Sequence, residues 1–102
     1  MNLEEIRSEE TLIGYVIHAA SGLPDATTFV TPHEANLQVG FVVKSPDEDV
    51  PRHDHKPVDR AIRGTAEVLV VLRGSGEVDF FDDDRRPIAT YRFGMNDVLV
   101  LL

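Results

Sequence analysis

The sequence predicts an all-β domain of antiparallel strands, arranged as a jelly-roll barrel, a partial barrel or a sandwich. Hydrophobic residues either alternate with polar ones or form short, fully apolar runs, and both patterns are typical of strands. Clusters rich in Gly, Pro, Asp and Asn separate these runs at short intervals and favour turns. No stretch has the periodicity of a long helix, although residues 1–10 could form one helical turn.

In the first half of the chain, the expected strands differ in strength. Residues 11–18 (TLIGYVIH) combine β-branched and aromatic side chains, which predicts a strand. We expect a short strand within residues 27–30 and a stronger one at residues 37–44 (LQVGFVVK). The polar stretch 45–49 predicts a turn, and residues 52–55 are expected to form a short extended segment.

The middle of the chain predicts a loop followed by a hairpin. Residues 56–64 are charged and form the expected loop. The apolar run Glu67–Arg73 (EVLVVLR) predicts a buried strand. Gly74, Ser75 and Gly76 predict a tight turn, because glycine supplies the positive φ that hairpin turns need, and residues 77–81 would then return as the partner strand.

The last part of the chain predicts two further strands, at residues 88–93 and 97–102. Residues 82–86 are expected to be a solvated hairpin turn. The final run, residues 98–102, is apolar to its last residue, so it would be an exposed edge unless a partner covers it or the chain is a shortened form of a longer domain.

Length and composition favour one soluble domain covering residues 1–102, with 42% hydrophobic and 27% charged residues. The absence of cysteine excludes a disulfide scaffold, a thiolate zinc site and a cysteine nucleophile. The acidic N-terminal residues lack the apolar run of a signal peptide, and no run approaches the length of a membrane span. We therefore expect a cytoplasmic protein without a membrane partner.

The formal net charge of −8 argues against a nucleic-acid partner, because binding to phosphates needs a basic surface. The basic residues Arg52, Lys56, Arg60 and Arg63 nevertheless cluster in one segment. A charge run of this kind is either a solvated loop or a local binding site for an anion. In the second case, Arg60 or Arg63 would bind the carboxylate or phosphate of a small anionic molecule.

The segment His53-Asp54-His55 contains two candidate metal ligands. In extended backbone, residues two apart point to the same side, so both imidazoles could bind one divalent metal ion. Glu67 is a candidate third ligand, because a carboxylate in an apolar strand needs a metal ion or a charged partner. Two histidines and one carboxylate suit iron, manganese, nickel or zinc. Alternatively, the His pair is structural, and Glu67 caps the strand or pairs with Arg63; His18 and His33 are interpreted as structural.

These residues resemble the first motif of the cupin superfamily of small β-barrels. Gly40, the His53–His55 pair, Glu67 and Gly74 follow in the family's order, with six residues between Glu67 and Gly74 as in the family. The spacer of eleven residues before Glu67 is longer than in the family and contains the basic segment. The third histidine ligand of the family's second motif would fall beyond Leu102, so the resemblance implies at most three protein ligands in this chain.

Cupins include enzymes, sensors and storage proteins, so the resemblance leaves three functions open. The first is a metal-dependent enzyme acting on a small anion, and the second is a non-catalytic module that binds a small ligand. The third is a structural barrel, either truncated or redesigned, without an active metal site. We expect a homodimer in the first two cases, because exposed strand edges favour pairing across a two-fold axis.

Overall fold

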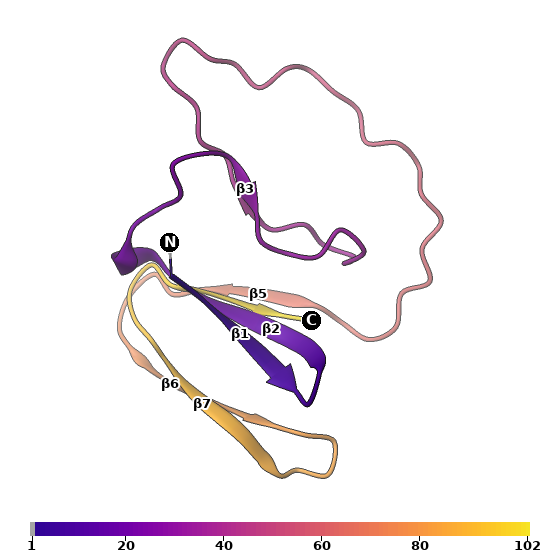
Figure 1. Ribbon diagram of the computed structural model, residues 1–102, viewed down its shortest axis with the longest axis vertical. Coiled ribbons are helices and arrows are strands. Elements are labelled where there is room, and N and C mark those ends of the chain that lie inside the picture. Colours follow the sequence, from indigo (N-terminus) through magenta and orange to yellow (C-terminus); the bar gives the residue numbers. More distant parts are fainter. Residues whose placement is uncertain (1) are drawn as a thin grey trace. The chain divides into compact units, whose positions relative to one another are not determined.

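The computed structural model describes residues 2–102, which form short strands and one 3-10 helix (Figure 1). The elements are β1 (Asn2–Ser8), β2 (Thr11–His18), η1 (Ala19–Ser21), β3 (Thr28–Phe29), β4 (Gly40–Phe41), β5 (Glu67–Val70), β6 (Gly76–Phe81), β7 (Pro87–Phe93) and β8 (Val98–Leu101). The chain divides into two compact units. One consists of Met1–Leu23 with Thr65–Leu102, and the other is Pro24–Gly64. We call them the sheet unit and the loop unit.

A four-stranded antiparallel sheet, in the order β1-β2-β8-β5, forms the centre of the sheet unit. β1 and β2 are joined by a tight turn in which Glu9 has a φ of 55°. β8, from the other end of the sequence, lies between β2 and β5. In Figure 1 the indigo β1 and β2 therefore lie beside the yellow end of the chain.

The hairpin of β6 and β7 packs on one face of this sheet. Its side chains Val78, Phe80, Tyr91 and Phe93 contact a fully buried cluster of three sheet residues, which are Ile6, Val16 and Leu99. The Phe80 and Tyr91 rings meet edge to face, with their centroids 5.8 Å apart. The sheet unit is thus a two-layer β structure whose core lies between the sheet and the hairpin.

Gly14 allows two central strands to approach each other closely. A Cβ atom at this position would collide with the carbonyl oxygen of Val100 on β8. Gly14 and Val100 both lie in paired strands, so neither strand could move aside without losing ladder hydrogen bonds. This explains a glycine in the middle of an otherwise β-branched strand.

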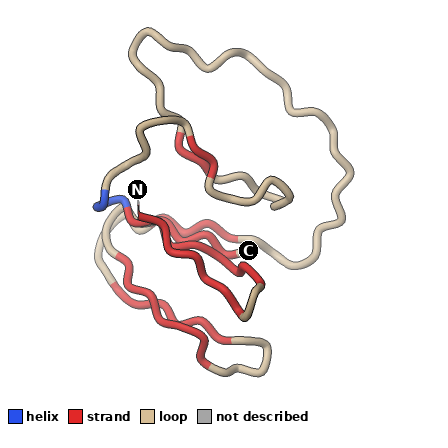
Figure 2. The backbone as a smooth tube through the Cα atoms, viewed as in Figure 1, coloured by secondary structure: helices blue, strands red, loops and turns tan. Residues whose placement is uncertain are grey.

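The loop unit contains little regular structure. β3 and β4 form a two-residue antiparallel ladder, and residues 42–66 contain no helix or strand (Figure 2). The predicted strand at 37–44 is therefore reduced to Gly40–Phe41, and the expected extended piece at 52–55 is a loop. The turn predicted at 45–49 is present, closed by the Glu48 N–H donating to the Ser45 carbonyl at 3.1 Å.

Two predictions about β structure are wrong. Residues 1–10 were expected to allow a helical turn, but Asn2–Ser8 is a strand, because a tight turn brings it into register with the strong strand Thr11–His18. The run Glu67–Arg73 was expected to be buried and to pair with residues 77–81. Instead β5 pairs with β8 and is exposed along its whole length, whereas β6 pairs with β7.

The apolar run 98–102 is not a free edge of the sheet. β8 has a partner on both sides, and Leu99 and Val100 are buried. The all-β fold class is confirmed, with antiparallel pairing throughout the described strands. The sheets of residues 2–102 do not close into a barrel, so a partial barrel or sandwich is the form that agrees with the structure. No helix in this part of the chain is long and apolar enough to cross a membrane.

Candidate anion-binding pocket

The loop unit contains an open concavity of about 390 Å³, and one residue of the basic segment lines it. Five residues line it: Phe29, Thr31, His33, Gln38 and Arg60. They come from β3, from the turn that follows it, and from the long loop after β4. The volume lies at the lower end of the range for small-molecule sites.

The wall of this pocket is braced by Gln38. The two N–H groups of its amide Nε2 are shared among the carbonyl oxygens of Pro32, His33 and Ala35, which lie 3.0, 3.3 and 3.2 Å away. Its Oε1 accepts from the hydroxyl of Thr31 at 3.3 Å. One side chain therefore holds together the turn that carries His33.

Thr31 is buried and joins this turn to the next segment of the chain. Its Oγ1 accepts from the N–H of Val39 at 3.0 Å, and the N–H of Val30 donates to the carbonyl of Val39 at 2.9 Å. The ladder of β3 and β4 thus continues through a side chain past its last regular pair. The polar atoms of Thr31 and Gln38 thus form hydrogen bonds within the wall of the pocket and stabilise it.

Phe29 forms an apolar part of the lining, and its position depends on Gly40. The two residues are directly paired between β3 and β4. A Cβ at Gly40 would lie 2.6 Å from Cδ1 of the Phe29 ring, so only glycine allows the ring to lie across the backbone of β4. The ring remains 59% exposed, which leaves it able to contact a ligand.

Arg60 is the cation of the pocket. Its Nη1 donates to the carbonyl oxygen of Ala35 at 3.3 Å, which anchors the guanidinium beside the braced turn. Because a guanidinium carries five N–H donors, this single bond leaves most of them for a ligand. Arg63, the other predicted anion-binding residue, lies in the same loop but is not among the residues that line the cavity, and its role stays a prediction.

His53 and His55 lie close together on the loop unit. Their rings are stacked, with centroids 5.3 Å apart and planes inclined by 21°. The Nδ1 of His53 is 2.9 Å from the carbonyl oxygen of Pro51. A carbonyl can only accept, so Nδ1 carries the proton, and the Nε2 of a neutral His53 ring is then free of a proton.

The third predicted metal ligand, Glu67, belongs to the sheet unit, at the start of β5. The set of His53, His55 and Glu67 therefore stays a prediction. Among residues 2–102, no group of three or more His, Cys, Asp or Glu side chains is arranged to hold a metal ion.

A histidine between two carboxylates lies in the sheet unit, where the sequence suggested only a structural residue. The Nε2 of His18 is 2.6 Å from Oε2 of Glu4, and its Nδ1 is 3.1 Å from Oδ2 of Asp97. Asp97 is buried and also accepts from the N–H groups of Ala19 and Gly94 at 3.1 and 2.8 Å. The cluster joins β1, the end of β2 and the turn before β8.

The contacts of this cluster shift both pKa values in the direction that favours an ion pair. The hydrogen bond that His18 donates to Glu4 raises the pKa of His18, and the contact with Asp97 adds to it, against the opposing effect of burial. Burial acts to raise the pKa of Asp97, but the hydrogen bonds from Gly94, His18 and Ala19 together lower it. The hydrogen bonds of Asp97 hold His18 and two backbone N–H groups in place, which indicates a structural role.

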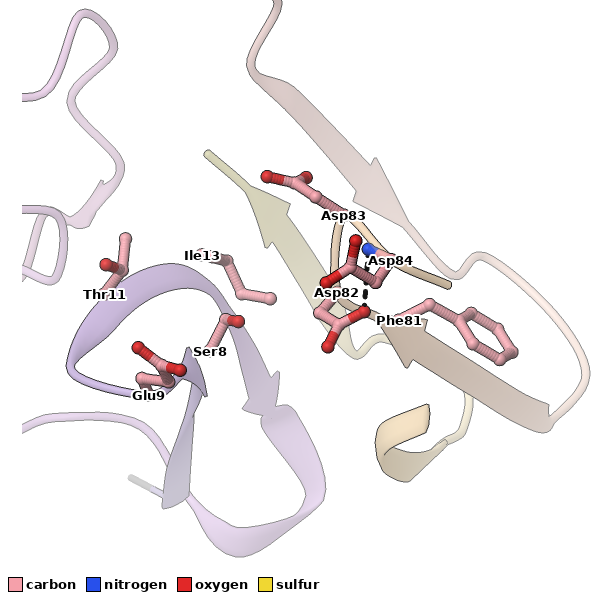
Figure 3. A pocket seen from close by; sticks show the side chains of 8 residues that line it. All are labelled: Ser8, Glu9, Thr11, Ile13, Phe81, Asp82, Asp83 and Asp84. Atoms are coloured by element: carbon pink, nitrogen blue, oxygen red, sulfur yellow. Dashed lines mark hydrogen bonds between the residues drawn. The ribbon is translucent and has the colours of Figure 1, made fainter. Parts of the chain in front are cut away.

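A second concavity lies in the sheet unit, between the β1–β2 turn and the β6–β7 turn (Figure 3). Its rim is acidic, with Glu9 on one side and Asp82, Asp83 and Asp84 on the other. Oδ1 of Asp82 accepts from the N–H groups of Asp84 and Arg86 at 2.9 and 2.8 Å, so this carboxylate holds the hairpin turn. The prediction of a hairpin turn at 82–86 is confirmed.

No family model, no curated protein and no solved structure matches the chain.

Sequence reasoning identified Arg60 but missed the other pocket residues. The pocket residues Thr31, His33 and Gln38 lie in and after a turn that contains a proline. The local sequence around them predicts a loop and gives no sign of a binding site. One signal was present in the sequence. Thr31 and Gln38 flank a turn at the end of a strand, where polar side chains often form the hydrogen bonds that the backbone lacks. The pocket forms only because the chain brings Arg60 back beside the turn that contains Ala35. No local sequence pattern predicts that contact.

Proposed function

We propose that this chain is a binding module for a small anionic molecule, held in the loop unit by Arg60. The observation that carries the proposal is the anchored guanidinium of Arg60 on the wall of a small cavity that also contains His33 and the Phe29 ring. A guanidinium binds a carboxylate through two parallel hydrogen bonds. The exposed aromatic ring favours a ligand with a flat or apolar body beside its charged group.

The charge distribution supports selectivity for an anion in an otherwise acidic chain. Arg60 lies in a segment with Arg52, Lys56 and Arg63, whereas the net charge of the whole chain is −8. Local positive charge raises the concentration of an anion at the pocket, while the acidic surface elsewhere repels long polyanions. A small, singly charged carboxylate fits these conditions better than a nucleic acid.

An Arg60→Ala variant is expected to bind benzoate at least about tenfold more weakly, because the bidentate contact is lost. Isothermal titration calorimetry with benzoate measures the affinity of both proteins. Benzamide keeps the ring but lacks the charge, so it should bind equally to the wild type and to the variant. Arg52→Ala removes a cation that does not line the pocket and serves as the matched control. Absence of benzoate binding to the wild type, or equal binding by Arg60→Ala, contradicts the proposal.

A second proposed function is the binding of a divalent transition metal by His53 and His55, whose ring centroids lie 5.3 Å apart. Histidine ligands commonly donate their second ring nitrogen to a backbone carbonyl, which fixes the tautomer. His53 has this contact, through Nδ1 to Pro51. A metal ion held by these two imidazoles would leave positions open for water or for further ligands.

Substitution of either His53 or His55 by Ala is expected to weaken Zn²⁺ binding at least about tenfold, because two imidazoles share one ion. Titration calorimetry with Zn²⁺ alone, on protein without an affinity tag, measures this. His33→Ala is the matched control, since this histidine lies in the pocket. Zn²⁺ affinity that is unchanged in both variants would remove the metal proposal.

A further inference from the structure

The edge strand of the sheet unit carries an apolar strip on its surface. β5 is the last strand of the sheet, and in the segment Glu67–Arg73 four hydrophobic side chains are exposed to solvent. Val68, Leu69, Val70 and Leu72 are 36%, 47%, 55% and 79% exposed. An apolar edge of this kind favours pairing with another strand. We call Glu67–Arg73 the β5 edge.

The backbone of the β5 edge has hydrogen-bonding groups that point away from the sheet. Val71 uses both of its groups toward the β8 side, donating to the Asp97 carbonyl at 2.9 Å and accepting from the Asn96 N–H at 2.6 Å. In an antiparallel ladder, alternate residues direct their N–H and C=O to opposite sides. The backbone N–H and C=O groups of Val68, Val70 and Leu72 therefore point away from β8.

The sequence of the β5 edge is complementary to itself when two copies run antiparallel. With Val70 opposite Val70 of a second copy, Val68 lies opposite Leu72, so the outward-pointing residues meet each other. The same register places Glu67 opposite Arg73 at both ends. Both side chains are exposed, and neither takes part in an ion pair within residues 2–102.

We propose that two copies of this chain associate through antiparallel pairing of their β5 edges, around a two-fold axis at Val70. The pairing joins the two four-stranded sheets into one continuous sheet and covers the apolar strip. Opposite charges at both ends select this register over a shift by one or two residues. This inference concerns the sheet unit and is independent of the pocket.

A closed dimer is favoured over an open chain of molecules. A two-fold axis uses the same edge in both copies, so no β5 edge remains for a third molecule. The opposite edge of the sheet, β1, carries Glu4, Glu5 and Arg7, and charged residues on an edge oppose strand addition. The complementary charges at Glu67 and Arg73 select a second copy over an unrelated apolar partner.

A Val70→Lys variant is expected to weaken dimer formation at least about tenfold, because two ammonium groups then face each other across the axis. Sedimentation velocity over protein concentrations from about 1 μM to about 1 mM measures the dissociation constant. Leu23→Lys, at a residue that is 64% exposed outside the β5 edge, is the matched control. A wild type that stays monomeric throughout this range, or a dimer unaffected by Val70→Lys, overturns the proposal.

Charge exchange tests the register without adding a charge at the axis. Glu67→Arg and Arg73→Glu are each expected to weaken the dimer, and the double variant is expected to restore it, because the two ion pairs are re-formed in reverse. Circular dichroism identifies any variant that fails to fold. A double variant no tighter than either single variant overturns the proposed register.

Discussion

An Asp97→Ala variant is expected to lose about 3 kcal/mol of its free energy of unfolding, because several buried bonds end on this one carboxylate. The substitution removes the acceptor of the Gly94 and Ala19 N–H groups and the anionic partner of His18. The carboxylate is 5% exposed, so water cannot replace it without rearrangement of the turn before β8. Urea denaturation at one protein concentration measures the change.

The pH dependence of stability separates the His18 ion pair from the backbone bonds. The raised pKa of His18 means that its contribution is complete below the ordinary value of 6.5 and is lost as pH rises through the folded-state value. The lowered pKa of Asp97 means that its contribution is complete above the ordinary value of 3.8 and is lost as pH falls. The wild type is therefore expected to be most stable between these two ordinary values and to weaken toward alkaline pH.

Two comparisons make this prediction specific. The decline toward alkaline pH is expected to be smaller in Asp97→Ala, since one of the two carboxylates that favour charged His18 is gone. Asp83→Ala, on the exposed hairpin turn, is the matched control and should stay within about 0.5 kcal/mol of the wild type. Equal stability of Asp97→Ala and Asp83→Ala would show that the cluster does not hold the sheet together.

A Leu99→Ala variant is expected to lose about 3 kcal/mol, by removal of apolar contacts and formation of a cavity. Leu99 is 3% exposed and contacts Ile6 and Val16 in the cluster under the β6–β7 hairpin. Because β8 is clamped between β2 and β5, the backbone cannot collapse to fill the space. Thermal and urea denaturation both measure the loss.

The matched control for this substitution is Leu23→Ala, which removes the same atoms from a side chain that is 64% exposed. It is expected to change the free energy of unfolding by no more than about 0.5 kcal/mol. A Leu99→Ala variant as stable as Leu23→Ala would mean that the hairpin does not pack on the sheet as described.

The sequence predicted the strands of the sheet unit well where local pattern and final environment agree. Thr11–His18 is a strand over the whole predicted range, since its β-branched and aromatic residues fit a central position. The partner of β5 could not be predicted in the same way. The glycines after Arg73 favour a hairpin locally, but β5 pairs with the apolar strand β8, so tertiary pairing outweighs turn preference.

The candidate site was less predictable than the sheet. Charge clustering identified Arg60, because a basic segment stands out in an acidic chain. The contribution of Gln38 depends on three carbonyl groups that point inward from one turn, which is a property of the folded backbone. Likewise, the pairing of His18 with Asp97 joins residues 79 positions apart, and only the sheet register brings them together.

The central position of β8 has a consequence for how this chain folds. β1 and β2 can pair as soon as their short turn forms, but the sheet is completed only when residues 98–101 reach residues 14–17 across the whole loop unit. Closing so long a loop costs entropy before any contact compensates it, which makes formation of the sheet the slow step. That entropic cost grows only with the logarithm of loop length, so residues could be added to the stretch 42–66 with little further cost. The segment that carries Arg60, the proposed anion-binding residue, is therefore also the one in which evolution can change length most freely.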